Sequence, residues 1–234
     1  MTRKSRAAFT LIEMLVVMAI IATIAAFALP AITGALTRGQ LTQAVSNARQ
    51  IYLSAFAMAT DGTQTGDAKY GWPGDLAVST DATVQITTVP QFVQRLVDND
   101  YLKPGDLKVF ATAGITPWNG RYIAPASPNS PGTLQPPFDG NANCAFKIYK
   151  VKESDGANAI FLATKNFTYS GNPTVAISSN ANPFGEKGFV IFHKGGDGTF
   201  YKRNQATSKA ILGVMPGATD TDTDELNTSI LQQQ

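Results

Sequence analysis

The hydrophobic pattern of the chain is dominated by one unbroken apolar stretch near its N-terminus. The stretch runs from Met14 to Ile32, and no charged residue occurs between Glu13 and Arg38. This uncharged span exceeds the ~20 residues that a helix needs to cross a ~30 Å hydrocarbon core. The pattern therefore predicts a membrane-spanning helix, preceded by three positively charged residues: Arg3, Lys4 and Arg6.

Beyond the apolar stretch, the pattern becomes that of an amphipathic helix. Apolar residues recur at steps of three and four, with polar residues between them. We expect one continuous helix from Phe9 to Thr60, half in lipid and half against a soluble domain, with Asp61-Gly62 as its stop. The residues on its apolar face are Leu41, Ala44, Val45, Ala48, Tyr52, Ala55, Phe56 and Ala59.

The middle of the chain predicts shorter elements. Residues 84–89 read as an edge strand, and residues 91–101 return to the helical period after Pro90. Residues 116–143 contain six prolines and little periodicity, which predicts a long Pro-rich loop. This loop is either a connector that covers a sheet edge or a contact with another subunit or partner.

The region from 144 to 203 predicts a small antiparallel sheet. Residues 145–151 and 159–164 flank the turn at Asp155-Gly156, and residues 188–193 and 199–202 flank a second glycine-rich turn. A long amphipathic helix needs such a sheet to bury its apolar face. The predicted fold class is therefore α+β: a long N-terminal helix packed on a small antiparallel sheet.

Glu13 stands out at the head of the apolar stretch. An ionised carboxylate inside a membrane helix costs on the order of 2.5–3.5 kcal/mol, so its presence there suggests a binding partner. A plain membrane anchor would not need this residue.

The segment Arg6-Ala7-Ala8-Phe9-Thr10-Leu11-Ile12-Glu13, with the apolar run behind it, resembles the prepilin-type cleavage and methylation motif. Type IV pilins and the pseudopilins of type II secretion systems carry this motif. The resemblance implies that prepilin peptidase cuts between Ala8 and Phe9 and N-methylates Phe9. It also implies that Glu13 pairs with the amino terminus of a neighbouring subunit. Ala8 departs from the family, which usually has glycine before the cut.

The resemblance implies a pilin-like organisation of the whole chain. Residues 1–8 form a basic leader, 9–37 a transmembrane and filament-core helix, 38–62 its amphipathic continuation, and 63–234 a globular head. Pro30, Gly34 and Gly39 lie within the helix, where proline costs about 3 kcal/mol and glycine about 1 kcal/mol relative to alanine. They form either a passive kink at the membrane exit or, as the resemblance implies, a weak point that loosens on assembly.

Two other kinds of N-terminal segment fit part of this pattern. An ordinary secretory signal peptide would be cut after Ala26-Phe27-Ala28, a small-x-small site. A simple signal anchor would not be processed at all. Glu13 and the helical pattern that continues past Ala28 argue against the signal peptide.

Charge and cysteine content narrow the class of protein. The formal net charge is +2, and removal of the leader leaves −1 for the mature chain, so no basic surface predicts nucleic-acid binding. Cys144 is the single cysteine of the 234 residues, which excludes an intramolecular disulfide. Many adhesive type IV pilins carry a disulfide near the C-terminus, so within the families that the chain resembles its absence favours a pseudopilin. We expect Cys144 to be a small buried residue at the start of a strand.

Few residues are candidates for metal binding or catalysis. Asp220, Asp222 and Asp224 offer oxygen ligands of the kind that Ca²⁺ takes, although the segment lacks the glycine and distal glutamate of an EF-hand. Some pseudopilins hold calcium near the C-terminus; the alternative is a solvated acidic tail. His193, the single histidine, is expected to be exposed on a strand, and no catalytic motif accompanies it. The sequence therefore predicts no enzyme and no firm cofactor.

The sequence predicts a pseudopilin of a type II secretion system, with its N-terminus in the cytoplasm and its head in the periplasm. The expected partners are prepilin peptidase, other pilin or pseudopilin subunits, the inner-membrane assembly platform and the lipid bilayer. One alternative is a type IV pilin of a surface filament for adhesion or motility. Another is a secreted or anchored binding domain with an ordinary signal sequence.

Overall fold

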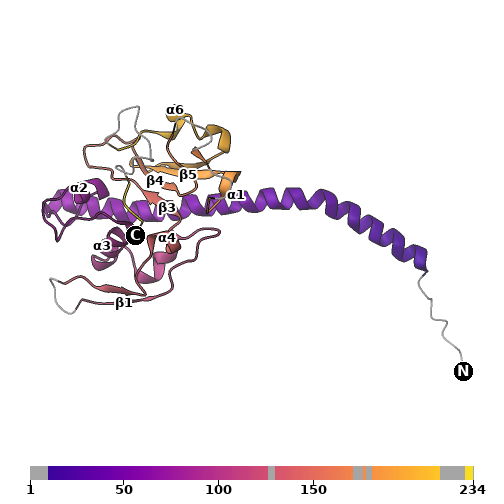
Figure 1. Cartoon of the computed structure of the whole chain (residues 1–234), viewed down its shortest axis with the longest axis horizontal. Coiled ribbons are helices and arrows are strands. Elements are labelled where there is room, and N and C mark those ends of the chain that lie inside the picture. The colour runs from indigo at the N-terminus through magenta and orange to yellow at the C-terminus, as the bar shows by residue number, and fades with distance from the viewer. Residues whose placement is uncertain (1–9, 126–129, 171–175, 178–180, 217–229, 234) are drawn as a thin grey trace, which may run out of the picture. The chain divides into compact units, whose positions relative to one another are not determined.

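The computed structural model describes residues 10–125, 130–170, 176–177, 181–216 and 230–233. The chain divides into two compact units, residues 1–39 and 40–234. Helix α1, Leu11–Thr65, contributes to both units (Figure 1).

Helix α1 ends later than the sequence predicts. The expected stop at Asp61-Gly62 is wrong, because the helix continues to Thr65. Gly62 instead allows the backbone of Tyr70 to lie against the helix, since a Cβ atom at residue 62 would lie 2.2 Å from the carbonyl oxygen of Tyr70. Gly66 follows the last helical residue, and its φ of +69° and N–H bond to the Gly62 carbonyl (2.9 Å) are typical of a glycine that caps a helix C-terminus.

The second unit combines short helices with two antiparallel sheets. One sheet has two strands, and the other has four strands in the order β3-β4-β5-β6. The strands are β1 (Arg121–Ile123), β2 (Thr133–Gln135), β3 (Phe146–Ile148), β4 (Ile160–Thr164), β5 (Phe189–His193) and β6 (Gly198–Tyr201). The α-helices are α2 (Pro73–Ala77), α3 (Val89–Asp98), α4 (Gly140–Asn143) and α6 (Lys209–Leu212); the 3₁₀ helices are η1 (Pro104–Phe110), η2 (Gly185–Lys187) and η3 (Arg203–Gln205).

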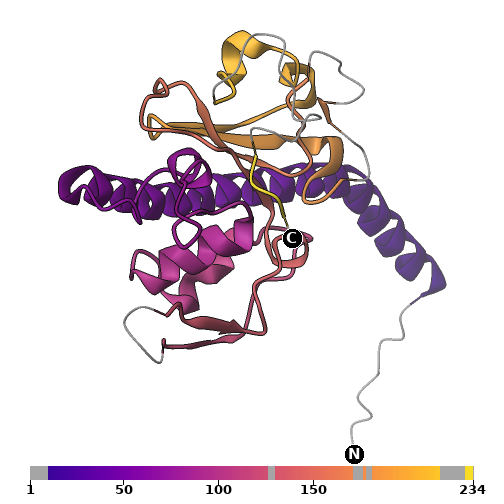
Figure 2. The same ribbon diagram turned by 60° about the vertical axis from the view of Figure 1, so that its left-hand side comes forward.

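The layers of this unit confirm the predicted α+β class. The part of α1 after residue 40 lies between the four-stranded sheet on one side and α3 with the two-stranded sheet on the other (Figures 1 and 2). All five residues of β4 and all five of β5 are buried, so the sheet is covered on both faces. One core cluster joins α1 and α3 to the sheet, and a second covers the opposite face with residues such as Phe167, Leu212 and Met215.

Two local predictions need correction. Residues 84–89 do not form a strand: Thr88 makes an isolated bridge and caps α3, in a capping box with Gln91. The 116–143 segment is less irregular than its six prolines predict, because β1, β2 and α4 lie within it. The β1-β2 pair is fixed by contacts with distant residues: Asp98 of α3 accepts hydrogen bonds from the Tyr122 hydroxyl (2.7 Å) and the Gly132 N–H (3.1 Å).

Candidate assembly site

The start of α1 presents a carboxylate that is already hydrogen-bonded within the chain. The Glu13 Oε2 atom accepts from the Thr10 N–H (2.8 Å) and the Thr10 hydroxyl (2.7 Å), while the Glu13 N–H donates to the Thr10 Oγ1 atom (3.3 Å). This is a capping box, which satisfies two N–H groups that a helix start would leave unpaired. The sequence reasoning missed Thr10, although the Thr-x-x-Glu spacing was visible.

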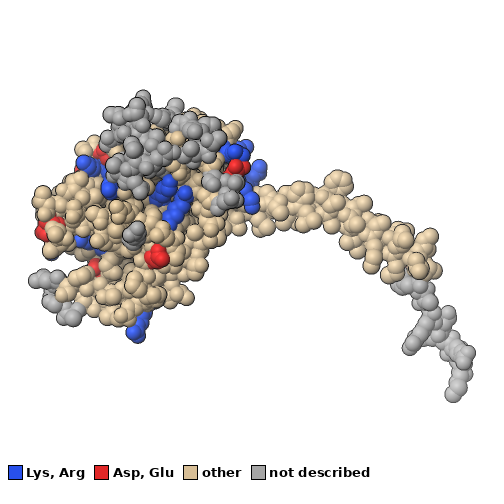
Figure 3. Space-filling model, viewed as in Figure 1, with Lys and Arg blue, Asp and Glu red and all other residues tan. Residues whose placement is uncertain are grey.

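Between Thr10 and Gly39, helix α1 displays its apolar side chains to the surroundings. Every residue of its most apolar window is unburied, and the helix is long and apolar enough to cross a membrane. No charged residue occurs between Glu13 and Arg38, and the helix is correspondingly tan over most of this part in Figure 3. Soluble monomers rarely expose apolar surface on this scale, so lipid or other subunits must cover it. The exposed large residues are Leu11, Ile12, Met14, Leu15, Val16, Val17, Met18, Ile20, Ile21, Ile24, Phe27, Leu29, Ile32 and Leu36.

Pro30, Gly34 and Gly39 all lie within the uninterrupted helix α1. The hydroxyl of Thr33 donates to the Pro30 carbonyl at 3.0 Å. A Cβ atom added at Gly34 or at Gly39 would meet nothing within 4 Å. Packing within the chain therefore gives no reason for either glycine, and their role as a weak point stays a prediction.

Several predicted site residues lie outside the described part of the chain. They are the cleavage and methylation positions Ala8 and Phe9, and the candidate calcium ligands Asp220, Asp222 and Asp224. Within the described residues, no group of three or more His, Cys, Asp or Glu side chains could hold a metal ion.

The single cysteine and the single histidine are both buried. Cys144 is fully buried just before β3, as predicted, and burial raises the pKa of its thiol to about 11. The prediction that His193 is exposed is wrong, since the residue is 6% exposed. Its Nε2 atom lies 2.8 Å from the Leu212 carbonyl oxygen, so this nitrogen is occupied as a donor and is not free to act as a general base.

Comparison with known proteins gives two matches. Residues 3–29 match the family model described as the prokaryotic N-terminal methylation motif. The chain is also 28% identical over 141 residues to the type IV major fimbrial protein FimA of Dichelobacter nodosus, a match that covers 59% of this chain and 75% of that protein. Both matches support a type IV pilin-like family for this chain.

No solved structure matches this pilin-like chain. The motif and the fimbrial relative support a pilin-type filament subunit. Pilin subunits are processed by prepilin peptidase and assemble with one another, and the apolar helix with its motif suggests anchoring in a membrane before assembly. The apolar part of α1 is thus the surface that assembly would cover.

Proposed function

We propose that this pilin-like chain is a pseudopilin, a subunit of the periplasmic filament of a type II secretion system. Prepilin peptidase cuts it between Ala8 and Phe9 and methylates the new amino terminus. The subunits then associate through residues 9–37. The observation that carries the proposal is the exposed apolar part of α1 with a single carboxylate, Glu13, at its start.

Glu13 guides the incoming subunit in this proposal. In the isolated chain its carboxylate is hydrogen-bonded to Thr10, whose hydroxyl is neutral. The bonds to Thr10 already involve a charged carboxylate, and a bond to a charged group contributes about 1.5–3 kcal/mol. Thr10, however, brings no opposite charge, whereas an ammonium adds the attraction between the two charges. The methylated ammonium of Phe9 on a neighbouring subunit is therefore a stronger partner than Thr10, and the difference favours assembly.

The remaining parts of the chain have distinct roles in this scheme. Residues 1–8 are the leader, and Arg3, Lys4 and Arg6 keep it in the cytoplasm of the cell, so that residues 63–234 lie in the periplasm. Residues 38–62 connect the filament core to the head. Pro30, Gly34 and Gly39 let the helix loosen when subunits are moved from the bilayer into the filament by the assembly platform.

The way the C-terminal segment is held favours a pseudopilus. Backbone hydrogen bonds join Leu231 N–H to the Ile148 carbonyl and Gln232 N–H to the Thr87 carbonyl, each at 2.9 Å. With Cys144 as the single cysteine, no disulfide within the chain reinforces this attachment. Many adhesive type IV pilins carry a disulfide near the C-terminus. A head without one suits a filament that stays within the envelope.

A surface pilus is the second candidate. The observation that favours it is the fimbrial relative, which shares 28% identity over 141 residues. A surface pilus and a pseudopilus would share cleavage at Phe9, pairing through Glu13 and a helical core. They differ in where the filament is found.

The deciding experiment combines mass spectrometry with cell fractionation. Protein from native membranes should begin at N-methyl-Phe9, and the Ala8→Gly variant should be cut at the same bond. A start at Leu29 would reveal an ordinary signal peptide and contradict the filament assignment. Mechanical shearing of intact cells then separates the two candidates, because a pseudopilus stays with the cells and a surface pilus is released.

A further inference from the structure

Three basic residues lie together at one end of the β5-β6 hairpin. Phe189 is opposite Tyr201 in this hairpin, so the chain enters β5 and leaves β6 at the same place. The basic residues at this place are all exposed, and we call them the basic corner: Lys187, Lys202 and Arg203. Their positive charges are therefore gathered in one part of the surface.

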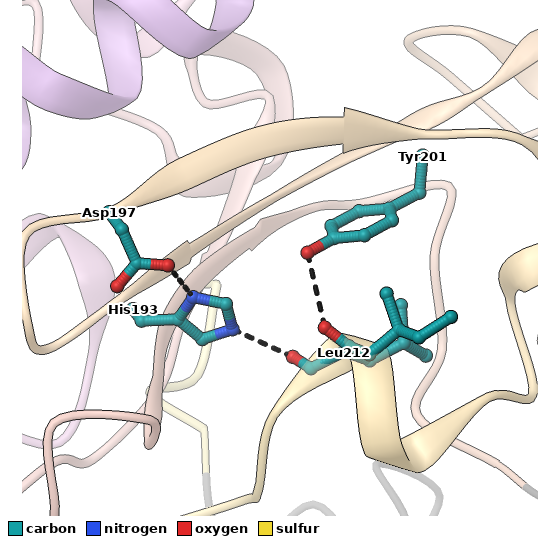
Figure 4. Close-up of polar contacts among 5 residues, drawn as sticks. His193, Asp197, Tyr201 and Leu212 are labelled. Carbon is teal, nitrogen blue, oxygen red and sulfur yellow. Dashed lines mark hydrogen bonds and ion pairs between the residues drawn. The ribbon is translucent and has the colours of Figure 1, made fainter.

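The backbone of the basic corner is held by contacts with other parts of the fold. Asn166, which is 2% exposed, donates from its Nδ2 atom to the carbonyls of Gly185 (2.7 Å) and Gly188 (2.8 Å), at the start of η2 and just after its end. On the other strand, the Tyr201 hydroxyl donates to the Ile211 carbonyl at 3.2 Å (Figure 4). A ligand that binds the basic corner therefore does not have to order its backbone first.

The positive charge of the basic corner is only partly neutralised. The Nη1 atom of Arg203 lies 2.5 Å from the Oε2 atom of Glu186, and the arginine side chain stays 55% exposed. The ammonium groups of Lys187 and Lys202 make no ion pair with another residue that the structure describes. Three positive charges and one negative charge leave a net charge of +2. The basic corner therefore favours a negatively charged partner.

The basic corner lies close to the residue at which α1 joins the second unit. A Cβ atom at Gly188 would lie 3.0 Å from the Cδ1 atom of Leu41, so the backbone next to Lys187 touches this part of the helix. Leu41 follows Arg38, the first charged residue after the apolar stretch, by three residues, which is about 4.5 Å along a helix. The length of the chain sets this separation, so it holds at any angle of the helix.

The thickness of a bilayer brings this part of the chain to the lipid headgroups. The uncharged residues from Met14 to Thr37 form a helix of about 36 Å, longer than the ~30 Å hydrocarbon core. The headgroup layers extend about 5–7 Å beyond the core on each side. A helix that spans the core therefore brings Leu41 to the headgroups or just beyond them, within reach of long lysine and arginine side chains nearby.

We propose that the basic corner binds the phosphate groups of anionic phospholipids in the membrane that anchors α1. This inference rests on the membrane anchoring in the proposed function, but not on the kind of filament. Lysine and arginine side chains near an anionic membrane surface are attracted to it, and salt weakens the attraction. Bound in this way, the head is held against the bilayer until the subunit leaves the membrane for assembly, when these contacts break.

The single, buried cysteine makes a site-specific test possible. In the full-length protein, Asn204→Cys places an accessible thiol beside the basic corner, and Gln64→Cys places one about 35 Å further along α1 than Leu41. Each variant is labelled with a fluorophore and inserted into nanodiscs whose lipid headgroups carry a quencher. The label at residue 204 should be quenched more in mixed phosphatidylglycerol and phosphatidylcholine than in phosphatidylcholine alone. The label at residue 64 should be quenched in neither.

Charge variants test whether the basic corner itself causes the quenching. Lys187→Gln/Lys202→Gln should lower the ratio of quenched to unquenched labels, measured from fluorescence lifetimes, about fivefold for each lysine removed. Lys69→Gln/Lys103→Gln removes two exposed lysines elsewhere in the head and should leave the ratio unchanged. An unchanged ratio in Lys187→Gln/Lys202→Gln, or equal losses in both double variants, would overturn the proposal.

Glu186→Gln should give an effect that a misfolded head could not imitate. The variant removes the carboxylate beside Arg203, so the ratio of quenched to unquenched labels should rise about fivefold. High salt should remove the difference between the two lipid compositions. Equal quenching in both compositions, in protein that has inserted into the nanodiscs, would overturn this inference and leave the proposed function intact. A chain that does not insert would contradict the membrane anchoring, and the inference with it.

Discussion

Residues 11–39 and residues 40–65 belong to one helix, yet the apolar side chains of the first part are exposed and many of those of the second part are buried. Phe27 is 83% exposed, whereas Ile51 is fully buried against the sheet. Both halves are helical, so helical structure alone does not decide burial. The difference lies in the partner: the head supplies one for the second half, and the first half needs a bilayer or neighbouring subunits to cover it.

The two regions also differ in the hydrogen-bond partners of their carboxylates. In the head, Asp98 accepts from the Gln94 amide, the Tyr122 hydroxyl and the Gly132 N–H, so that its hydrogen bonds hold distant segments together. Among the described residues, Glu13 bonds only to Thr10, three residues away. A carboxylate with purely local bonds is ready to change partner, and one that joins distant segments is structural.

Replacing Glu13 should have the largest effect of the variants considered. Glu13→Ala should still be cleaved and inserted into the membrane, but filament assembly should be abolished, because the neighbour's ammonium loses its partner. Glu13→Gln keeps the length of the side chain without its charge and should fail in the same way. Immunoblots of cleavage and electron microscopy of filaments measure both steps. Normal filaments from Glu13→Gln would show that the charge is not needed.

A matched pair of phenylalanine variants tests the contrast in burial. Phe161 is fully buried, with ring centroids 5.7 Å from Trp72 and 6.0 Å from Tyr52. Phe161→Ala should lower the free energy of unfolding of the head by about 3–5 kcal/mol. Phe27→Ala, in the exposed half of α1, should change it by less than about 0.5 kcal/mol. Denaturant unfolding in detergent, followed by near-ultraviolet circular dichroism, makes the comparison; equal losses would contradict it.

The sequence predicted the elements whose signals are local. The apolar stretch, the amphipathic period of residues 41–59 and the apolar runs of β4 and β5 each indicate their structure without reference to the rest of the chain. The resemblance to prepilins likewise depends on eight consecutive residues. Both the fold class and the family could therefore be predicted.

The predictions failed where contacts with residues far away in the sequence determine the local structure. Gly62 was taken as a helix stop, but its role depends on the approach of Tyr70. His193 was expected to be exposed because its neighbours on the strand gave no sign of Leu212, nineteen residues later. The β1-β2 pair depends on Asp98, which lies on another element. Local composition contains no information on such contacts.

The bonds to Asp98 make a smaller, pH-dependent prediction. Burial, followed by the hydrogen bond to Asp98, raises the pKa of Tyr122 to about 12. Because this value lies above the ~10 of an unfolded tyrosine, the bond stabilises the head fully below pH ~10 and is lost as the pH rises through about 12. In Asp98→Asn the Tyr122 midpoint should fall toward ~10, as ring-carbon resonances would show. An unchanged midpoint would assign the shift to burial alone.

Substitutions at Gly34 and Gly39 should leave the stability of the head unchanged, and they sharpen the comparison most. Neither glycine has an atom within 4 Å of its would-be Cβ, so Gly34→Ala and Gly39→Ala meet no steric resistance and should each stabilise the helix by about 1 kcal/mol. Head stability should not change, but filament assembly should slow, because a stiffer helix loosens less readily. Gly105→Ala is a control within the head, where the added methyl group also meets nothing within 4 Å. If the double variant Gly34→Ala/Gly39→Ala assembles as fast as Gly105→Ala, the helix has no weak point there, and the exposed half of α1 enters the filament as a rigid rod.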